Sequence, residues 1–274
     1  MSGAGPVPVV TGLEAYRVAV AGLPMRARLA TDADADTVAG AIVVVDGAGS
    51  WWDAAATAVD AGARAVLVSE PRVAPVESAT KLLERSTVPI VVHRARLRQD
   101  FVAQAAAARD GVPPRIVVAE ARGSTAALHA IVRDAVGWIR ALGDGRLAVA
   151  SAAATSRGGA AMLRSRDDGR VVGSLILAAS EPRGELLRVR ALGETATEVE
   201  IDEGMGRWEV TTSTAAGRTI APTRFEEGER ATLRRAVGAV ASGATRLPDL
   251  EDLLHDAAAA ETIAPFVPES SLFG

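Results

Sequence analysis

The stretch AIVVVDGAGSWWDAAATAVDAGARAVLVSEP, residues 41–71, decides the fold. It opens with an unbroken apolar run, residues 41–45, which is typical of a strand buried on both faces. Residues 51–61 carry apolar side chains at helical spacing, and Gly62 is placed to end a helix. A second apolar run, residues 65–68, follows. Strand, helix and strand in this order predict a parallel sheet with right-handed crossovers.

Two carboxylates follow the strands of this unit. Asp46 ends the first predicted strand, and Glu70 follows the second. Ligands of parallel sheets bind beyond the carboxyl ends of the strands, so both residues are candidates for a binding or acid–base site.

The chain has 274 residues, a net charge of −4 and no cysteine. Without cysteine there is no disulfide, thiol catalysis or thiolate metal site, and no His, Asp and Glu cluster has the spacing of metal ligands. The small negative charge argues against nucleic acid or an anionic membrane as a partner. The sequence has no signal-peptide pattern and no apolar run of membrane length, so we expect a cytoplasmic protein.

Strand and helix patterns alternate through the first part of the chain and change character at Pro114. We therefore predict an α/β domain at residues 1–114, a shortened Rossmann-like domain with a parallel sheet. Beyond it, residues 125–143 form one apolar stripe at helical spacing, which predicts a long helix.

The second half of the chain carries strand-like segments with turns between them, from residue 147 to 220. Two amphipathic helices are predicted near residues 227–242 and 249–263. We therefore predict an α+β domain at residues 115–274, with an open, mostly antiparallel sheet covered by helices.

Three segments carry a further pattern. AGARAVLVSEP, residues 61–71, is a short strand that ends in an acidic residue and proline. VPIVVHRARLRQDF, residues 88–101, runs from a strand into an arginine-rich loop. ALHAIVRDAVGWIRALG, residues 127–143, is a helix with a histidine, an aspartate, an aromatic residue and a terminal glycine. In this order the segments resemble the glucose–fructose oxidoreductase and inositol dehydrogenase family, written Gfo/Idh/MocA.

Members of that family are usually NAD(P)-dependent oxidoreductases of sugars or polyols, so the resemblance implies a dinucleotide site in the first domain. The candidate cofactor-binding residues are Gly12, Asp32 and Asp46. The candidate catalytic residues are Glu70, His129 and Asp134. In the family the open sheet face commonly forms the subunit interface, which implies a homo-oligomer or a hetero-oligomer with a complete homologue.

The sequence departs from the family pattern in three places. Gly12 stands alone in VVTGLEAY, where the dinucleotide fingerprint has closely spaced glycines. Glu70 occupies the position of the lysine in the family's Glu-Lys-Pro. His129 and Asp134 are too far apart to match the family's His-x-x-Asp. We therefore expect a degenerate member that binds no cofactor and serves as a non-redox accessory or structural partner subunit.

Two alternatives stay open. The first is an NAD(P)-dependent sugar or polyol oxidoreductase with an atypical nucleotide loop. The second is a lyase or isomerase that needs no cofactor and uses Asp46, Glu70 or His129. The competing interpretation of His129 and Asp134 is a solvated polar helix surface. His93, which follows a predicted strand, is also a candidate base.

Overall fold

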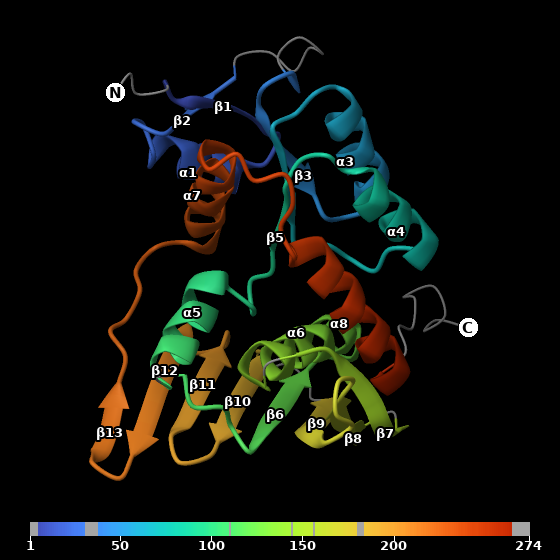
Figure 1. Ribbon diagram of the computed structural model, residues 1–274, viewed down its shortest axis with the longest axis vertical. Helices are drawn as coiled ribbons and strands as arrows, with labels where there is room; N and C mark the ends of the chain where they lie inside the picture. The colour runs from blue at the N-terminus through green and yellow to red at the C-terminus, as the bar shows by residue number, and fades with distance from the viewer. Residues whose placement is uncertain are drawn as a thin grey trace. The chain divides into compact units, whose positions relative to one another are not determined.

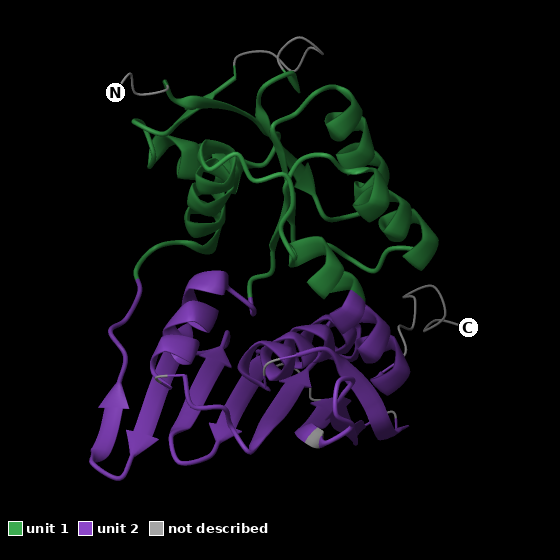
Figure 2. Ribbon diagram, viewed as in Figure 1, with its two compact units in different colours: residues 1–95, 225–254 green, residues 96–224, 255–274 purple. Residues whose placement is uncertain are grey.

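The computed structural model describes residues 5–30, 38–109, 111–143, 145–155, 157–179 and 184–264. Contacts divide the chain into two compact units (Figure 2). Unit 1 comprises Met1–Ala95 and Phe225–Leu254, and unit 2 comprises Arg96–Arg224 and His255–Gly274. Each unit therefore contains segments from both halves of the chain.

These units differ from the predicted division after residue 114, because two helices pack away from their sequence neighbours. Helix α5 (Gln99–Ala107) buries Phe101 in the core of unit 2. Helix α7 (Gly228–Ala241) buries Leu233 in the core of unit 1. The sequence gives no sign of either destination, since an amphipathic helix can cover either sheet.

Unit 1 is built on a five-stranded parallel sheet with the order β2-β1-β3-β4-β5 (Figure 1). Its strands are β1 (Val7–Val10), β2 (Ala27–Leu29), β3 (Ile42–Asp46), β4 (Ala65–Ser69) and β5 (Ile90–His93). Its helices are α1 (Glu14–Ala21), α3 (Trp51–Asp60), α4 (Val76–Arg85), α7 and the first residues of α8 (Asp249–Ile263). The predicted Rossmann-like sheet is confirmed.

The two central strands show why their apolar runs decide the fold. Ile42, Val66, Leu67 and Val68 have no exposed surface. Ile42 and Leu67 pack with α1 and α7, whereas Val66 and Val68 pack on the other face with α3 and α4. Burial on both faces requires an unbroken apolar run, which is the pattern that the sequence shows.

Unit 2 is built on an eight-stranded sheet with the order β13-β12-β11-β10-β6-β9-β8-β7. Its strands are β6 (Ile116–Gly123), β7 (Leu147–Thr155), β8 (Gly158–Ser165), β9 (Val171–Ala179), β10 (Leu186–Leu192), β11 (Ala196–Asp202), β12 (Arg207–Thr214) and β13 (Gly217–Ile220). Neighbouring strands are antiparallel except β6 and β9, which are parallel. The predicted open, mostly antiparallel sheet is confirmed.

One face of this sheet is covered by α5, by α6 (Thr125–Gly143) and by the second half of α8 (Figure 1). The side chain of Ser124 accepts the N–H of Ala127 at 3.3 Å and so caps α6. Ile131, Ala135 and Ile139 lie fully buried along its apolar stripe, as predicted. Among the described residues, no helix combines the length and apolar content that crossing a bilayer requires.

The other face of the sheet carries paired charges. Arg188 of β10 donates to Glu200 of β11 at 2.7 Å, and Arg190 donates to Glu120 of β6 at 2.7 Å. Pairs of opposite charge on neighbouring strands stabilise the sheet. The register places Ile176 of β9 beside Glu120 on this same face, where 53% of its surface is exposed.

Candidate functional site

The carboxyl ends of β3, β4 and β5 form one edge of the five-stranded sheet. The register pairs Asp46 with Ser69 and Ser69 with His93, so these residues lie in one row across three strands. Neighbouring strands of a sheet are about 4.8 Å apart. Because the strand order reverses between β1 and β3, this edge is where sheets of this type bind ligands. We refer to it as the carboxyl edge.

Gly47 lets β3 and β4 approach closely at the carboxyl edge. Its N–H donates to the carbonyl of Ser69 at 2.7 Å, and its carbonyl accepts the N–H of Arg72 at 2.9 Å. A Cβ at residue 47 would lie 2.3 Å from the Ser69 carbonyl oxygen and 2.4 Å from backbone atoms of Glu70. A larger residue would therefore displace the segment that carries Glu70.

Glu70 has a backbone φ of 49°, the only positive φ outside glycine in the described part of the chain. Strain of this kind persists where the surrounding structure imposes it, and it clusters at functional sites. The N–H of Glu70 donates to the carbonyl of His93 at 2.9 Å, and its carboxylate accepts the N–H of Ala95. Its side chain is 44% exposed, so the carboxylate is anchored and still accessible.

Asp46 lies at the same edge but faces its own turn. It is exposed, and its Oδ1 accepts the N–H of Ala48 at 3.0 Å. The structure thus brings Asp46 and Glu70 to one edge, as predicted. The two carboxylates accept backbone N–H groups from different segments, and Asp46 shapes the turn that leads to α3.

His93 and Tyr16 are buried near Glu70, with 4% and 1% of their surfaces exposed. The Tyr16 hydroxyl is 3.1 Å from Nδ1 of His93, and Oε1 of Glu70 is 3.9 Å from the same nitrogen. Burial raises the pKa of Tyr16 above its usual value, so the phenol is protonated at neutral pH. The carboxyl edge combines an accessible carboxylate with a buried imidazole and a buried phenol.

The turn between β1 and α1 adjoins this edge and is the position at which such sheets hold a dinucleotide. No side chain caps α1; its N-cap residue is Leu13, whose N–H donates to Oγ1 of Thr11 at 3.1 Å. First-turn amides have no acceptor within a helix and attract phosphate. A Cβ at Gly12 would meet nothing within 4 Å, so the turn is open. These backbone features fit a diphosphate.

Glu14 is the residue of this turn that fits a diphosphate poorly. It lies in the first turn of α1, where its carboxylate would repel a second anion. Arg17 lies 3.9 Å away and offsets part of that charge, although both side chains are largely exposed. Asp32, the candidate ligand of a ribose hydroxyl, lies outside the described residues.

His129 and Asp134 lie on α6 in unit 2, and both are buried. Nε2 of His129 is 3.3 Å from Glu261 of α8, and Asp134 accepts from Arg133 at 3.1 Å. Burial lowers the pKa of His129, although Glu261 acts in the opposite direction. The interpretation of a solvated helix surface is wrong for both residues, because the helix turns them toward its packed side. Their catalytic role stays a prediction.

Arg96, from the arginine-rich loop, joins separate segments of unit 2. It pairs with Glu185, with Glu203 at 3.0 Å and with Asp134 at 3.7 Å. Its carbonyl accepts the indole N–H of Trp138 at 2.7 Å. A partly buried guanidinium among carboxylates fixes the arrangement of these segments, and breaking such a pair is costly.

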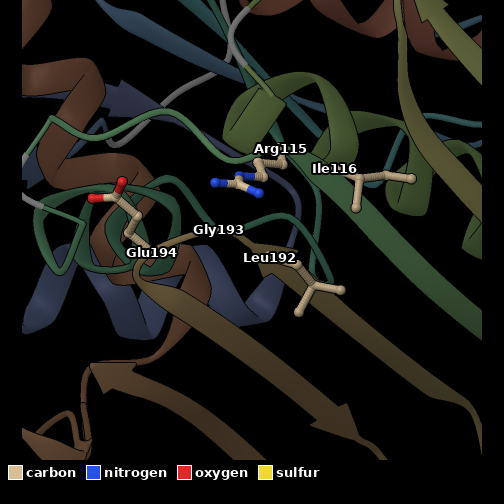
Figure 3. A pocket seen from close by; sticks show the side chains of 5 residues that line it. All are labelled: Arg115, Ile116, Leu192, Gly193 and Glu194. Carbon is tan, nitrogen blue, oxygen red and sulfur yellow. The ribbon is translucent and has the colours of Figure 1, made fainter. Parts of the chain in front are cut away.

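No group of three or more His, Cys, Asp and Glu side chains in the described ranges is arranged to hold a metal ion. A hollow of about 370 Å³ in unit 2 is lined by Arg115, Ile116, Leu192, Gly193 and Glu194. Figure 3 shows these residues from close by. None of these residues is buried. Small-molecule sites enclose most of their ligand, so this open hollow is a weaker candidate than the carboxyl edge.

The roles of Tyr16 and Ser69 at the carboxyl edge were not predicted from the sequence. Tyr16 is the only tyrosine in the chain, and it lies on the apolar side of the helix that follows the β1 turn. A buried tyrosine hydroxyl needs a hydrogen-bond partner, and that requirement is the signal that could have found it.

No protein-family model matches the sequence, and a search among curated proteins finds no match either. Solved structures do match. An oxidoreductase from Sinorhizobium meliloti has a TM-score of 0.70 at 14% identity, covering 95% of this chain and 97% of that chain. A lysine-to-glutamate variant of a 3-ketoreductase from Actinomadura kijaniata, in complex with TDP-benzene and NADP, has a TM-score of 0.65 at 16% identity and covers 95% and 97%. A UDP-N-acetylglucosamine 3-dehydrogenase from Acidithiobacillus ferrooxidans has a TM-score of 0.65 at 13% identity and covers 94% and 96%.

The chain therefore has the fold of these oxidoreductases over nearly its whole length, in agreement with the resemblance to Gfo/Idh/MocA proteins. The expectation that the protein binds no cofactor is contradicted, because the similar structures include chains that hold NADP. The physical reason lies at Gly12, where the turn is open without further glycines. The expected loss of redox function finds no support in these comparisons.

Replacing Gly47 with alanine should lower the free energy of unfolding by about 1–3 kcal/mol, because the added methyl group overlaps the backbone of β4. Urea unfolding measures the change. Gly12→Ala is the matched control, since a Cβ there meets nothing within 4 Å. Equal losses in the two variants would contradict the role assigned to the close approach at Gly47.

The two histidines of the helical layer in unit 2 should make stability depend on pH. Burial lowers the pKa of His129 and of His255 from the ordinary value of 6.5. The folded protein therefore binds fewer protons than the unfolded chain below that pH, and its free energy of unfolding should fall as the pH drops.

Urea unfolding of the double variant His129→Asn, His255→Asn should show a shallower pH dependence than the wild type between about pH 7 and pH 5. Identical slopes for the two proteins would show that these histidines do not resist protonation in the fold.

Proposed function

We propose that the protein is an NAD(P)-dependent oxidoreductase that acts on a hydroxyl or ketone group of a sugar or polyol, with its site at the carboxyl edge. The observation that carries this proposal is the group formed by Glu70, His93 and Tyr16 at that edge. The likeness of the fold to an NADP-bound 3-ketoreductase and to a 3-dehydrogenase of a sugar nucleotide supports it.

The β1–α1 turn is the part of the chain that we assign to the dinucleotide. Its first-turn amides stand at the positive end of the helix dipole and would donate to a diphosphate. Gly12 leaves room for that approach, and the Glu14 carboxylate weakens it. Asp46, at the next strand end, stays a candidate contact for the same ligand.

A bound nicotinamide ring would supply the carbon that accepts or gives up a hydride. The chain's own residues hold the substrate and handle its proton. When a hydroxyl group is oxidised, its proton must be taken up, and we assign that role to the carboxylate of Glu70. Glu70 suits the role because its side chain is half exposed and is oriented by the N–H of Ala95.

A partner subunit that binds a dinucleotide without turnover is the second candidate. It is favoured by Glu70, which stands where the resembling family has lysine, and by Glu14 in the nucleotide turn. Such a subunit would assemble with a catalytically complete homologue. An assay for turnover separates the two candidates.

Titration calorimetry with the oxidised and reduced forms of NAD and NADP tests the cofactor. We expect at least one of them to bind with a micromolar Kd. Glu14→Gln should tighten this binding about twofold to fivefold, because it removes an exposed like charge from the helix terminus.

Glu77→Gln is the matched control. Like Glu14, Glu77 lies in the first turn of a helix of unit 1, is 80% exposed and pairs with a basic residue, Lys81. This variant should bind as the wild type does. If neither the wild type nor Glu14→Gln binds a dinucleotide, the proposed function is wrong. If binding occurs and nicotinamide absorbance stays constant with a panel of sugars, polyols and sugar nucleotides, the second candidate is favoured.

We further propose that the open face of the eight-stranded sheet is a subunit interface, in a homo-oligomer or with a homologous chain. Ile176 supports this, because it is half exposed beside Glu120, which pairs with Arg190. Exposed apolar side chains among satisfied polar pairs are the composition of a protein interface.

Light scattering at micromolar concentration should give at least a dimer for the wild type, and Ile176→Arg should shift it toward the monomer by placing a charge in the interface. Glu77→Gln, which removes a carboxylate from α4 in unit 1, serves as the control. A wild-type monomer across the concentration range argues against a homo-oligomer.

A further inference from the structure

Tyr16 reaches the carboxyl edge from α1, 77 residues away from His93 in the sequence. The two rings stand edge to face at 85°, with centres 6.2 Å apart, and the hydroxyl lies 3.1 Å from Nδ1. Both side chains are buried. A buried hydroxyl group without a partner is destabilising, so this hydrogen bond stabilises the carboxyl edge.

Nδ1 of His93 faces two different groups, the hydroxyl of Tyr16 at 3.1 Å and Oε1 of Glu70 at 3.9 Å. A neutral Nδ1 without hydrogen accepts the O–H of Tyr16. A protonated Nδ1 cannot accept that hydrogen and instead donates toward the carboxylate. The protonation state of His93 therefore decides whether it binds the buried phenol or the accessible carboxylate.

Ser69 is a second hydrogen-bond partner of the Tyr16 hydroxyl. Burial raises the pKa of Tyr16 most strongly, a hydrogen bond with Ser69 lowers it, and the charges of Glu229 and Glu70 raise it. The phenol thus keeps its proton at neutral pH. The hydrogen bond with Ser69 lowers the pKa because the serine hydroxyl donates to the phenol oxygen. A hydroxyl group can also accept, so the two hydroxyl groups can reverse this bond when Nδ1 no longer accepts. Glu229, on α7, is the charged group that faces this pair from the helical side.

We propose that His93 accepts the proton that Glu70 has taken up, and that Tyr16 is a positioning residue that orients the imidazole ring. This inference rests on the proposed function. The O–H bond of the Glu70 carboxyl group breaks, and an N–H bond forms at Nδ1 of His93. The hydroxyl hydrogen of Tyr16 turns from Nδ1 to Ser69. One proton moves, no electron is transferred, and Glu70 becomes a carboxylate again.

Transfer of the proton from Glu70 to His93 requires one change in the geometry. Glu70 must shorten its 3.9 Å separation from Nδ1, and its half-exposed side chain has the freedom to do so. Its backbone is held in place, because the N–H of Glu70 donates to the carbonyl of His93 at 2.9 Å and the N–H of Gly47 donates to the carbonyl of Ser69 at 2.7 Å. Proton transfer then needs a side-chain rotation and no movement of a strand.

The chain has three histidines, so long-range proton–nitrogen spectra resolve each imidazole, and His129→Asn and His255→Asn assign the other two. At alkaline pH His93 should carry its hydrogen on Nε2. Tyr16→Phe keeps the ring and removes the donor, so the proton affinity of His93 should rise about threefold or more. Glu70→Gln removes the facing charge, so that affinity should fall by a similar factor.

Glu77→Gln, on α4 and paired with Lys81, is the control for a lost carboxylate and should leave His93 unchanged. Opposite shifts in Tyr16→Phe and Glu70→Gln support the relay. Unchanged His93 resonances, or shifts in the same direction, overturn it. If Tyr16→Phe does not fold, the result for Glu70→Gln decides alone: a lower proton affinity supports the relay and an unchanged one overturns it.

The same samples are titrated with NADPH, so that the coupling between His93 and Glu70 and the proposed function can be rejected separately. Opposite shifts with no NADPH binding keep the coupling between His93 and Glu70 and reject the proposed function. NADPH binding without opposite shifts rejects the coupling alone. If turnover is found, Tyr16→Phe should also move the pH profile of kcat while the KM for NADPH stays unchanged.

Discussion

The contact between Gly47 and Ser69 is the constraint on which the carboxyl edge depends. A hydrogen bond of 2.7 Å joins the two backbones at a distance that only glycine permits. The chain then leaves β4 through Glu70 in a conformation that side chains avoid. That turn presents the carboxylate to solvent while keeping it near His93. The chemistry assigned to this edge therefore rests on the backbone contact between Gly47 and Ser69.

Much of the fold could be predicted because strands buried on both faces leave a strong pattern in the sequence. The apolar runs at residues 41–45 and 65–68 predicted β3 and β4, and the stripe on residues 125–143 predicted α6. The division into units could not be predicted. Helix α7 follows the eight-stranded sheet in sequence but packs on the five-stranded one, and its amphipathic pattern is the same for either sheet.

The candidate site could be predicted only where topology alone fixes it. Asp46 and Glu70 share an edge because parallel strands end together, and the sequence sufficed for that. The contact of Tyr16 with His93 depends on a ring that reaches from a helix to a strand far along the chain. The expected lack of a cofactor was wrong. It rested on the missing glycines and on Glu70 at the position of the family's lysine, whereas the room at the turn depends on what surrounds Gly12.

The central claim is that a nicotinamide dinucleotide binds at the carboxyl edge and the β1–α1 turn. Amide hydrogen exchange with and without NADPH tests it most directly, because it locates the ligand residue by residue. We expect slower exchange at residues 12–15 and at residues 69–71, with smaller changes elsewhere in unit 1. Unchanged exchange in both segments under saturating NADPH, or protection confined to unit 2, would contradict it.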